Sequence, residues 1–181
     1  MAANRAPAAA SRPRTIAVLA LDDGAPAPAV AQLLARALQG RGSVAELTAD
    51  RDRSGEAMAT ALDRAEASSD RVVLTAAVPV PGDEWSDLYL READLIVAVT
   101  QGNPGPAWID RPAGLKGCEL LVTGPGIRAD VVAALEPRET RVVREGRISS
   151  RELRRWPTDS AARHLGSCSP AAALGASPTS G

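Results

Sequence analysis

The 181-residue sequence predicts a parallel α/β domain, and three observations support that fold class. Apolar runs of strand length alternate along the chain with segments of helical periodicity. These runs are apolar throughout rather than at every second position, which is typical of strands covered on both faces. The chain contains no Phe, so its core must be built mainly from thin aliphatic side chains. We therefore expect a Rossmann-like, mostly parallel sheet of about five or six strands, with helices on both faces.

Each strand is predicted from an apolar run that ends in polar or turn-forming residues. The run Asp94–Thr100, with the sequence DLIVAVT, is the strongest, and Thr15–Leu21 ends at the turn signal DDG. The remaining predicted strands are Ser43–Thr48, Arg71–Ala77, Cys118–Gly124 and Thr140–Glu145.

Apolar side chains three or four positions apart predict the helices between these strands. The segment Pro28–Gly42 has this spacing from Val30 to Leu38, and Gly40 and Gly42 are its stop signals. The other predicted helices are Ser54–Ala67, Asp83–Ala93 and Ala129–Glu136. A loop rich in Gly and Pro is expected over residues 102–117.

The predicted domain spans residues 14–147 and is flanked by two segments without periodicity. Residues 1–13 are rich in Ala, Pro and Arg. Residues 148–181 contain the basic stretch RELRRW (151–156) and continue from residue 160 as a tract of Ser, Ala, Pro and Gly. Segments of such composition bury too little apolar surface to fold alone, so both are expected to be disordered.

The composition excludes several classes of function. With 21 basic and 22 acidic residues the chain has no global field to attract a polyanion, so no nucleic-acid partner is expected. Cys118, Cys168 and His164 are too few and too far apart for a zinc site or a disulfide framework. The N-terminus has no apolar signal segment, and no run is long enough to cross a bilayer, so we expect a cytoplasmic protein.

The loop after the first strand of an open α/β sheet is where ligands usually bind, and here it reads LDDGAPAPAV. A phosphate-binding loop needs several glycines and a P-loop also needs a Lys, whereas this loop has Gly24 alone. Asp22 and Asp23 would fit the Mg²⁺ site of a receiver domain, and Thr100 follows the fourth strand suitably. The third strand, however, ends in TAA and supplies no phosphoryl-accepting Asp.

The sequence also lacks the pattern of a nucleophilic hydrolase. It has no G-x-S-x-G turn, and the string DGA at 23–25 is interpreted as an ordinary turn. His164 lies in the tail, and Cys118 opens a buried strand, where we expect a core residue rather than a reactive thiol. The aromatic residues expected to seal helix–sheet contacts are Trp85, Tyr89 and Trp108.

One resemblance concerns the scaffold. The stretches TIAVLALDDG (15–24), AQLLARALQGRGSVAELTADRD (31–52) and READLIVAVTQGNP (91–104) resemble the deviant P-loop ATPases that position partition and septum proteins. The Lys-bearing glycine loop of those proteins is missing here, so the resemblance supports the fold and not the activity. It leaves a degenerate P-loop-like, protein-binding module as one open interpretation.

A second resemblance covers roughly residues 15–147. The opening TIAVLALD, the helix with Trp85 that leads into LREADLIVAV (90–99), and ELLVTG (119–124) follow the order of one α/β segment. That segment is found in bacterial patatin-like phospholipases of the neuropathy target esterase type, between the cyclic-nucleotide-binding domains and the catalytic patatin domain. The resemblance implies a non-catalytic regulatory or linker domain, of a family active in lipid metabolism, with those domains as its partners.

Complete members of that family look like serine lipid hydrolases with a Ser-Asp dyad and a glycine oxyanion loop. No residue here aligns with those groups, so we expect no catalytic, cofactor-binding or metal-binding residue, and membrane association only through the missing catalytic domain. Lys116 is the only Lys among 21 basic residues, which suggests GC-rich coding DNA. If residues 163–181 are encoded by such GC-rich codons, the same DNA read in a neighbouring frame can encode the family's glycine loop. We therefore expect a frameshifted tail that begins near or after Arg147.

Overall fold

The computed structural model describes residues 14–49, 54–76, 84–102 and 113–143. These residues form a six-stranded, all-parallel sheet, so the predicted α/β fold is confirmed. The strands are β1 (Thr15–Ala20), β2 (Val44–Thr48), β3 (Arg71–Ala76), β4 (Leu95–Thr100), β5 (Glu119–Val122) and β6 (Glu139–Val142), in the order β2-β3-β1-β4-β5-β6. The segments predicted to be disordered, 1–13 and 148–181, lie outside the described residues.

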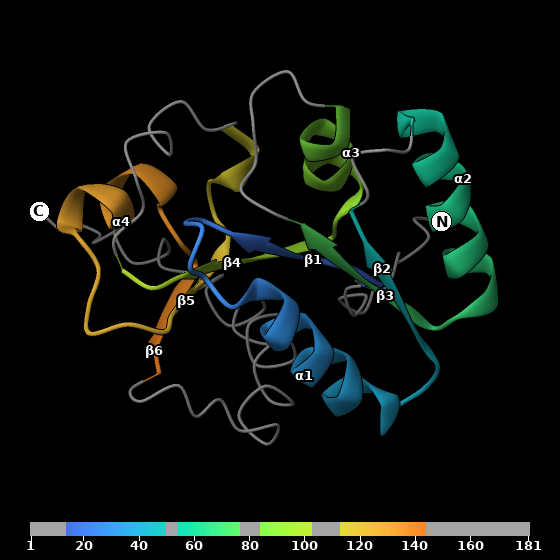
Figure 1. Ribbon diagram of the computed structural model, residues 1–181, viewed down its shortest axis with the longest axis horizontal. Coiled ribbons are helices and arrows are strands. Elements are labelled where there is room, and N and C mark those ends of the chain that lie inside the picture. The colour runs from blue at the N-terminus through green and yellow to red at the C-terminus, as the bar shows by residue number, and fades with distance from the viewer. Residues whose placement is uncertain (1–13, 50–53, 77–83, 103–112, 144–181) are drawn as a thin grey trace, which may run out of the picture.

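Within the described residues four α-helices cover the sheet, and Figure 1 shows how they are arranged. They are α1 (Ala27–Gln39), α2 (Gly55–Ser68), α3 (Glu84–Glu92) and α4 (Ala129–Leu135). Helix α1 packs on one face, and α2, α3 and α4 pack on the other (Figure 1). Each α-helix overlaps a predicted one, and Met58, Leu62 and Ala65 are the buried side of α2, as their spacing predicts.

Side chains of the strands alternate between two cores because successive strand residues point to opposite faces. Ile16 and Val18 of β1 belong to the core beneath α1, whereas Ala17 and Leu19 belong to the core beneath α2 and α3. All four have no exposed surface. This burial on both sides explains why β1 reads as a continuous apolar run.

The connection from β1 runs one way across the sheet and every later connection runs the other way, which creates a switch point beside β1. From β1 the chain passes through α1 and skips one position to reach the edge strand β2. It then returns through α2 to β3, crosses to β4 through α3, and continues in the same direction to β6. Parallel crossovers are right-handed, so the reversal places α1 on the opposite face from the other helices that the structure describes. Ligands of such sheets bind where outgoing connections diverge, which here is the carboxyl end of the β1–β4 pair.

The observed boundaries differ from the predicted ones mainly at loops. Ser54 is the N-cap of helix α2, and its hydroxyl accepts a hydrogen bond from the Ala57 backbone N–H (3.3 Å). The region 102–117, predicted as a loop, contains the short 3-10 helix Ala113–Leu115. Leu115 of this helix is buried and packs in the core. The Gly/Pro composition of the region gave no indication of this contact.

Candidate functional site

The carboxyl ends of β1 and β4 are joined by one carboxylate. Asp22 follows β1, and its Oδ2 accepts hydrogen bonds from the Thr100 hydroxyl (2.5 Å) and from the Gln101 backbone N–H (3.0 Å). The Thr100 Oγ1 atom accepts in turn from the Gly102 N–H at 2.8 Å. Asp22 therefore fastens the loop after β1 to the end of β4 through a continuous hydrogen-bonded chain.

Close contacts also join the described parts of the loops at this edge. Gln101 donates from Nε2 to the Gly24 carbonyl at 2.6 Å, and a Cβ on Gly24 would lie 2.9 Å from Gln101 Oε1. A Cβ on Gly124, in the loop after β5, would lie 1.7 Å from the Gln101 carbonyl oxygen. A Cβ on Gly102 would lie 1.6 Å from the Gly126 carbonyl oxygen, and Gly102 also has a φ of +101°. Only glycine fits at Gly102 and Gly124.

The switch point is therefore occupied by the protein's own groups. The structure brings together Asp22 and Thr100, the two residues that matched a receiver domain, but it does so by bonding one to the other. Asp23 is exposed beside them and belongs to the turn predicted from the DGA string. Among the described residues no group of three or more His, Cys, Asp or Glu side chains could hold a metal ion. The arrangement serves to hold the loops together.

Of the other candidate residues, some lie in the core and the rest lie outside the described residues. Trp85 and Tyr89 are buried, with ring centroids 6.0 Å apart, and they seal the contact of α3 with the sheet as predicted. Cys118 is a buried free thiol, and burial raises its pKa to about 12, so it is a core residue as expected. Trp108, His164 and Cys168 lie outside the described residues.

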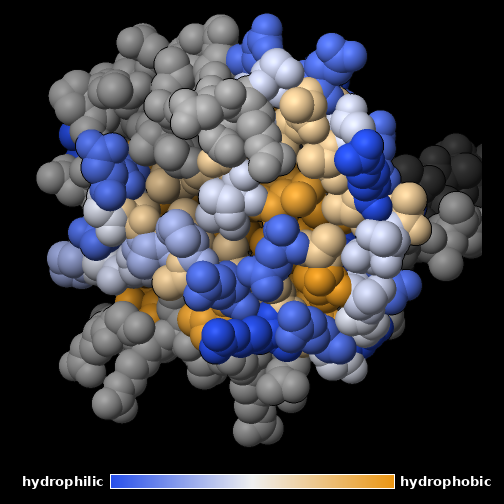
Figure 2. Space-filling view, turned by 45° about the vertical axis from the view of Figure 1, so that its right-hand side comes forward, coloured by the Kyte–Doolittle hydropathy of each residue, from blue (hydrophilic) through white to orange (hydrophobic). Residues whose placement is uncertain are grey.

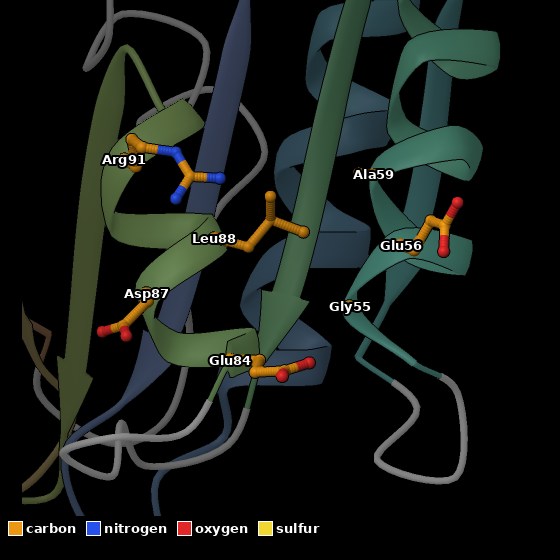
Figure 3. Close-up of a pocket in the computed structure, with 7 residues that line it drawn as sticks. All are labelled: Gly55, Glu56, Ala59, Glu84, Asp87, Leu88 and Arg91. Atoms are coloured by element: carbon orange, nitrogen blue, oxygen red, sulfur yellow. The ribbon is translucent and has the colours of Figure 1, made fainter.

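A groove of about 350 Å³ lies between α2 and α3. Figure 3 shows that Leu88 points into the space between the helices and that Glu84 extends from α3 towards the first turn of α2. A Cβ on Gly55 would lie 2.8 Å from Glu84 Oε2, so the carboxylate sits against the start of α2. Glu56 and Asp87 line the groove with carboxylates that point away from each other (Figure 3). The groove thus has an apolar floor at Leu88, with Glu84 and the guanidinium of Arg91 directed towards it and the carboxylates of Glu56 and Asp87 directed outwards (Figure 3).

Sequence reasoning missed this groove, and the reason is physical. Acidic residues in the first turn of a helix are ordinary, because they favour the positive end of the helix dipole. Glu56 and Glu84 each occupy such a position, so neither indicates a binding surface on its own. Only the packing of α2 beside α3 brings them together.

In the ranges that the structure describes, no helix has both the length and the apolar character needed to cross a bilayer. Comparison with protein-family models, with curated proteins and with solved structures gave no match. The fold and the site together define the class of this chain as a parallel, Rossmann-like α/β domain whose switch point is closed by its own loops.

Proposed function

We propose that this chain is a non-catalytic regulatory or linker domain of the patatin-like phospholipase type, which acts through contacts with neighbouring domains. The closed switch point is the observation that carries the proposal. At the edge where such sheets usually bind ligands, Asp22 accepts from the Thr100 hydroxyl and the Gln101 N–H, and the Thr100 oxygen accepts from the Gly102 N–H. Groups used in this way support a scaffold rather than a reaction centre.

The order of motifs over residues 15–147 is what supports the family and, through it, the partners in this proposal. In relatives of that type the corresponding segment lies between cyclic-nucleotide-binding domains and a patatin hydrolase. A sheet domain in that position would transmit the state of the cyclic-nucleotide-binding domains to the hydrolase, provided that it contacts both. The free thiol of Cys118 is compatible with a reducing cytoplasm, where we place the protein.

An activity assay tests the non-catalytic role directly. We expect the purified full chain to show no hydrolysis of a chromogenic fatty ester above that of the Asp22→Ala variant or of buffer. Turnover by the wild-type chain that a single substitution abolishes would overturn the proposal. Deletion of the corresponding segment from an intact relative should weaken the regulation of its hydrolase by cyclic nucleotide. Unchanged regulation would argue equally against a relay.

The DNA that encodes residues 144–181 and the region beyond tests the family assignment. We expect a neighbouring frame to encode the glycine loop followed by a G-x-S-x-G motif. A stop codon followed by an unrelated gene would contradict the assignment and favour the second candidate.

The second candidate function is a degenerate P-loop-like module that binds protein at the edge of its sheet. It is favoured by the edge strand β2, where Val44, Ala45 and Leu47 remain half-buried with no strand beyond them in the described sheet. Figure 2 shows the side of the molecule that carries this strand and α2, with apolar residues exposed among hydrophilic ones. Exposed sheet edges are common sites of strand addition.

A further inference from the structure

In the described sheet β2 has a strand neighbour on one side only (Figure 1). Its bonds to β3 include the Ser43 carbonyl, which accepts at 3.2 Å, and the Ala49 N–H, which donates at 2.8 Å. The backbone groups of successive strand residues alternate in direction, so the odd-numbered residues from 43 to 49 face β3. The N–H and C=O groups of Val44, Glu46 and Thr48 therefore point away from the sheet, where another strand could bond to them.

The two faces of this edge carry different side chains, because successive side chains of a strand alternate between faces. Ala45, Leu47 and Ala49 lie on the face covered by α2, where they are half-buried against the core. Glu46 and Thr48 lie on the face of α1 and are exposed. The α2 face of the edge is thus apolar throughout, and it is symmetric about Leu47, with one alanine two positions before it and one two positions after.

We infer that β2 is the interface of a homodimer, in which it pairs antiparallel with β2 of a second copy about a two-fold axis through Leu47. A two-fold interface must be complementary to itself. This one places Leu47 opposite its own copy and Ala45 opposite Ala49 of the partner subunit. The outward-pointing backbone of Glu46 then bonds to that of Thr48 of the partner subunit. The two six-stranded sheets become one continuous sheet.

Charge favours this axis over the neighbouring one. An axis through Glu46 would place the two carboxylates directly opposite each other, and like charges in that position are destabilising. With the axis through Leu47, each Glu46 carboxylate lies opposite a Thr48 hydroxyl, which can donate to it. The other edge strand of the described sheet, β6, carries the ion pair of Glu139 and Arg141, and charges on an edge strand oppose strand pairing.

Helix α2 leaves room for the second copy. Gly55 and Ala59 of this helix line the groove towards α3, which lies over β1. At 3.6 residues per turn, Ala57 and Ala61 lie on the opposite flank, which faces the edge of β2. Ala57 is exposed and Ala61 half-buried. Their small side chains let the α2 helices of two subunits approach each other above the joined strands.

The dimer rests on the second candidate function, in which the chain binds protein at the edge of β2, and it names that protein as a second copy. A monomeric chain would overturn the dimer alone. The ester assay and the DNA sequence test the proposed functions without reference to the oligomeric state.

Sedimentation velocity of the full chain over a range of concentrations measures the monomer–dimer equilibrium. Thr48→Lys should tighten the dimer about three- to tenfold, because it places a cation opposite Glu46 of the partner subunit. Thr48→Glu should weaken the dimer by a similar factor, because it opposes two carboxylates. Thr140→Lys is the matched control, since Thr140 is an exposed threonine on β6, and it should leave the equilibrium unchanged.

A disulfide tests the position of the axis. Burial raises the pKa of Cys118 to about 12, so in a Cys168→Ser background Leu47→Cys supplies one reactive thiol. Opposed residues at a non-hydrogen-bonded position have Cα atoms about 4.5 Å apart, within the range of about 4.4–6.8 Å that a disulfide spans. Mild oxidation should therefore link two copies through Leu47→Cys much faster than through Glu46→Cys.

Four results would each overturn the dimer at β2. The first is a chain that stays monomeric at every concentration, and the second is a dimer that both Thr48 variants leave unchanged. The third is a dimer that Thr140→Lys alone weakens, because its interface would then be β6. The fourth is faster linkage through position 46 than through position 47, which would place the axis at Glu46.

Discussion

The carboxyl edge and the amino edge of the β1–β4 pair are fastened by the same device. At the carboxyl edge, Oδ2 of Asp22 accepts from the Thr100 hydroxyl and the Gln101 N–H. At the amino edge, Oδ2 of Asp94 accepts from the backbone N–H groups of Arg14 (2.8 Å) and Thr15 (3.0 Å). Parallel α/β sheets bind their ligands at the carboxyl edge, so the amino edge shows what purely structural use of an aspartate looks like. The likeness of the two edges is why we interpret Asp22 as a structural residue.

The two edges differ in what fills the space around the carboxylate. The amino edge is held by side chains, as when the Thr15 hydroxyl donates to Glu66 Oε1 at 2.6 Å. The carboxyl edge is held by backbone in contact with backbone, at Gly102 and Gly124. Side chains can rearrange after a substitution, whereas backbone atoms of a packed sheet cannot move far. We therefore expect substitutions to be tolerated less well at the carboxyl edge.

The largest expected effect is on the alkylation rate of Cys118, which lies at the amino edge just before β5. Burial raises the pKa of this thiol from 9.0 to about 12, so at pH 8 its thiolate fraction falls about a thousandfold. In the Cys168→Ser chain, alkylation by iodoacetamide should be at least that much slower in the native state than in urea. Mass spectrometry of timed samples measures both rates. Native and unfolded rates within tenfold of each other would show that the amino edge opens readily.

The next effect breaks the backbone contact at the carboxyl edge. The added methyl group of Gly124→Ala would overlap the Gln101 carbonyl oxygen, so we expect a loss of about 3 kcal/mol or more in the free energy of unfolding. Gly126→Ala is the matched control in the same loop, because a Cβ there meets nothing within 4 Å. Urea unfolding of both variants measures the difference. Equal stability of the two would show that the loop after β5 is free to move.

A third comparison removes each aspartate in turn. Asp22→Ala and Asp94→Ala each leave two donors without an acceptor, so each should cost about 1–3 kcal/mol of stability. Asp23→Ala, at an exposed position, should change stability by less than about 0.5 kcal/mol. Urea unfolding at neutral pH measures all three. If Asp22→Ala instead stabilised the protein, Asp22 would differ in kind from Asp94, because residues at functional sites are often kept at a cost in stability.

The fold could be predicted from the sequence because its signals are local. The run TIAVLAL and the helical spacing after Pro28 each depend on neighbouring residues, and buried parallel strands need no other pattern. The ends of elements were less predictable. Leu21 was expected to be the last residue of the first strand, yet the ladder ends at Ala20, although the Leu21 N–H still bonds to the Val99 carbonyl.

The candidate site was predictable only in part. Topology alone places Asp22 and Thr100 at one edge. Whether they face a ligand or each other depends on the directions of their side chains, which the spacing of residues in the sequence does not determine. Gly124 looked like a strand end, and its role depends on the Gln101 carbonyl, far away in sequence. The groove arises only when α2 packs beside α3. Contacts of this kind are tertiary, and one sequence carries no record of them.

The smallest expected effect is a pH dependence at the amino edge, where Asp70 fastens β2 to β3. Its Oδ2 accepts from the Ser43 backbone N–H (2.8 Å) and hydroxyl (2.9 Å), and these bonds lower the pKa of Asp70 below its ordinary value of 3.8. A depressed pKa means that the ionised carboxylate contributes stability above pH 3.8, and that this contribution is lost as the pH falls through the folded pKa.

Ser43→Ala should raise the pKa of Asp70 towards its ordinary value, because one of the two donors is removed while the backbone N–H remains. The acid end of the stability profile should become flatter by the same change. An NMR titration of the side-chain carboxyl carbons measures it. Asp130, whose pKa is lowered by its hydrogen bond to Arg128 at the far side of the sheet, is the internal control and should titrate unchanged. An Asp70 pKa that stays where it was would mean that the Ser43 backbone N–H alone lowers it, and this contact of the amino edge would then depend on a backbone group, as the contacts of the carboxyl edge do.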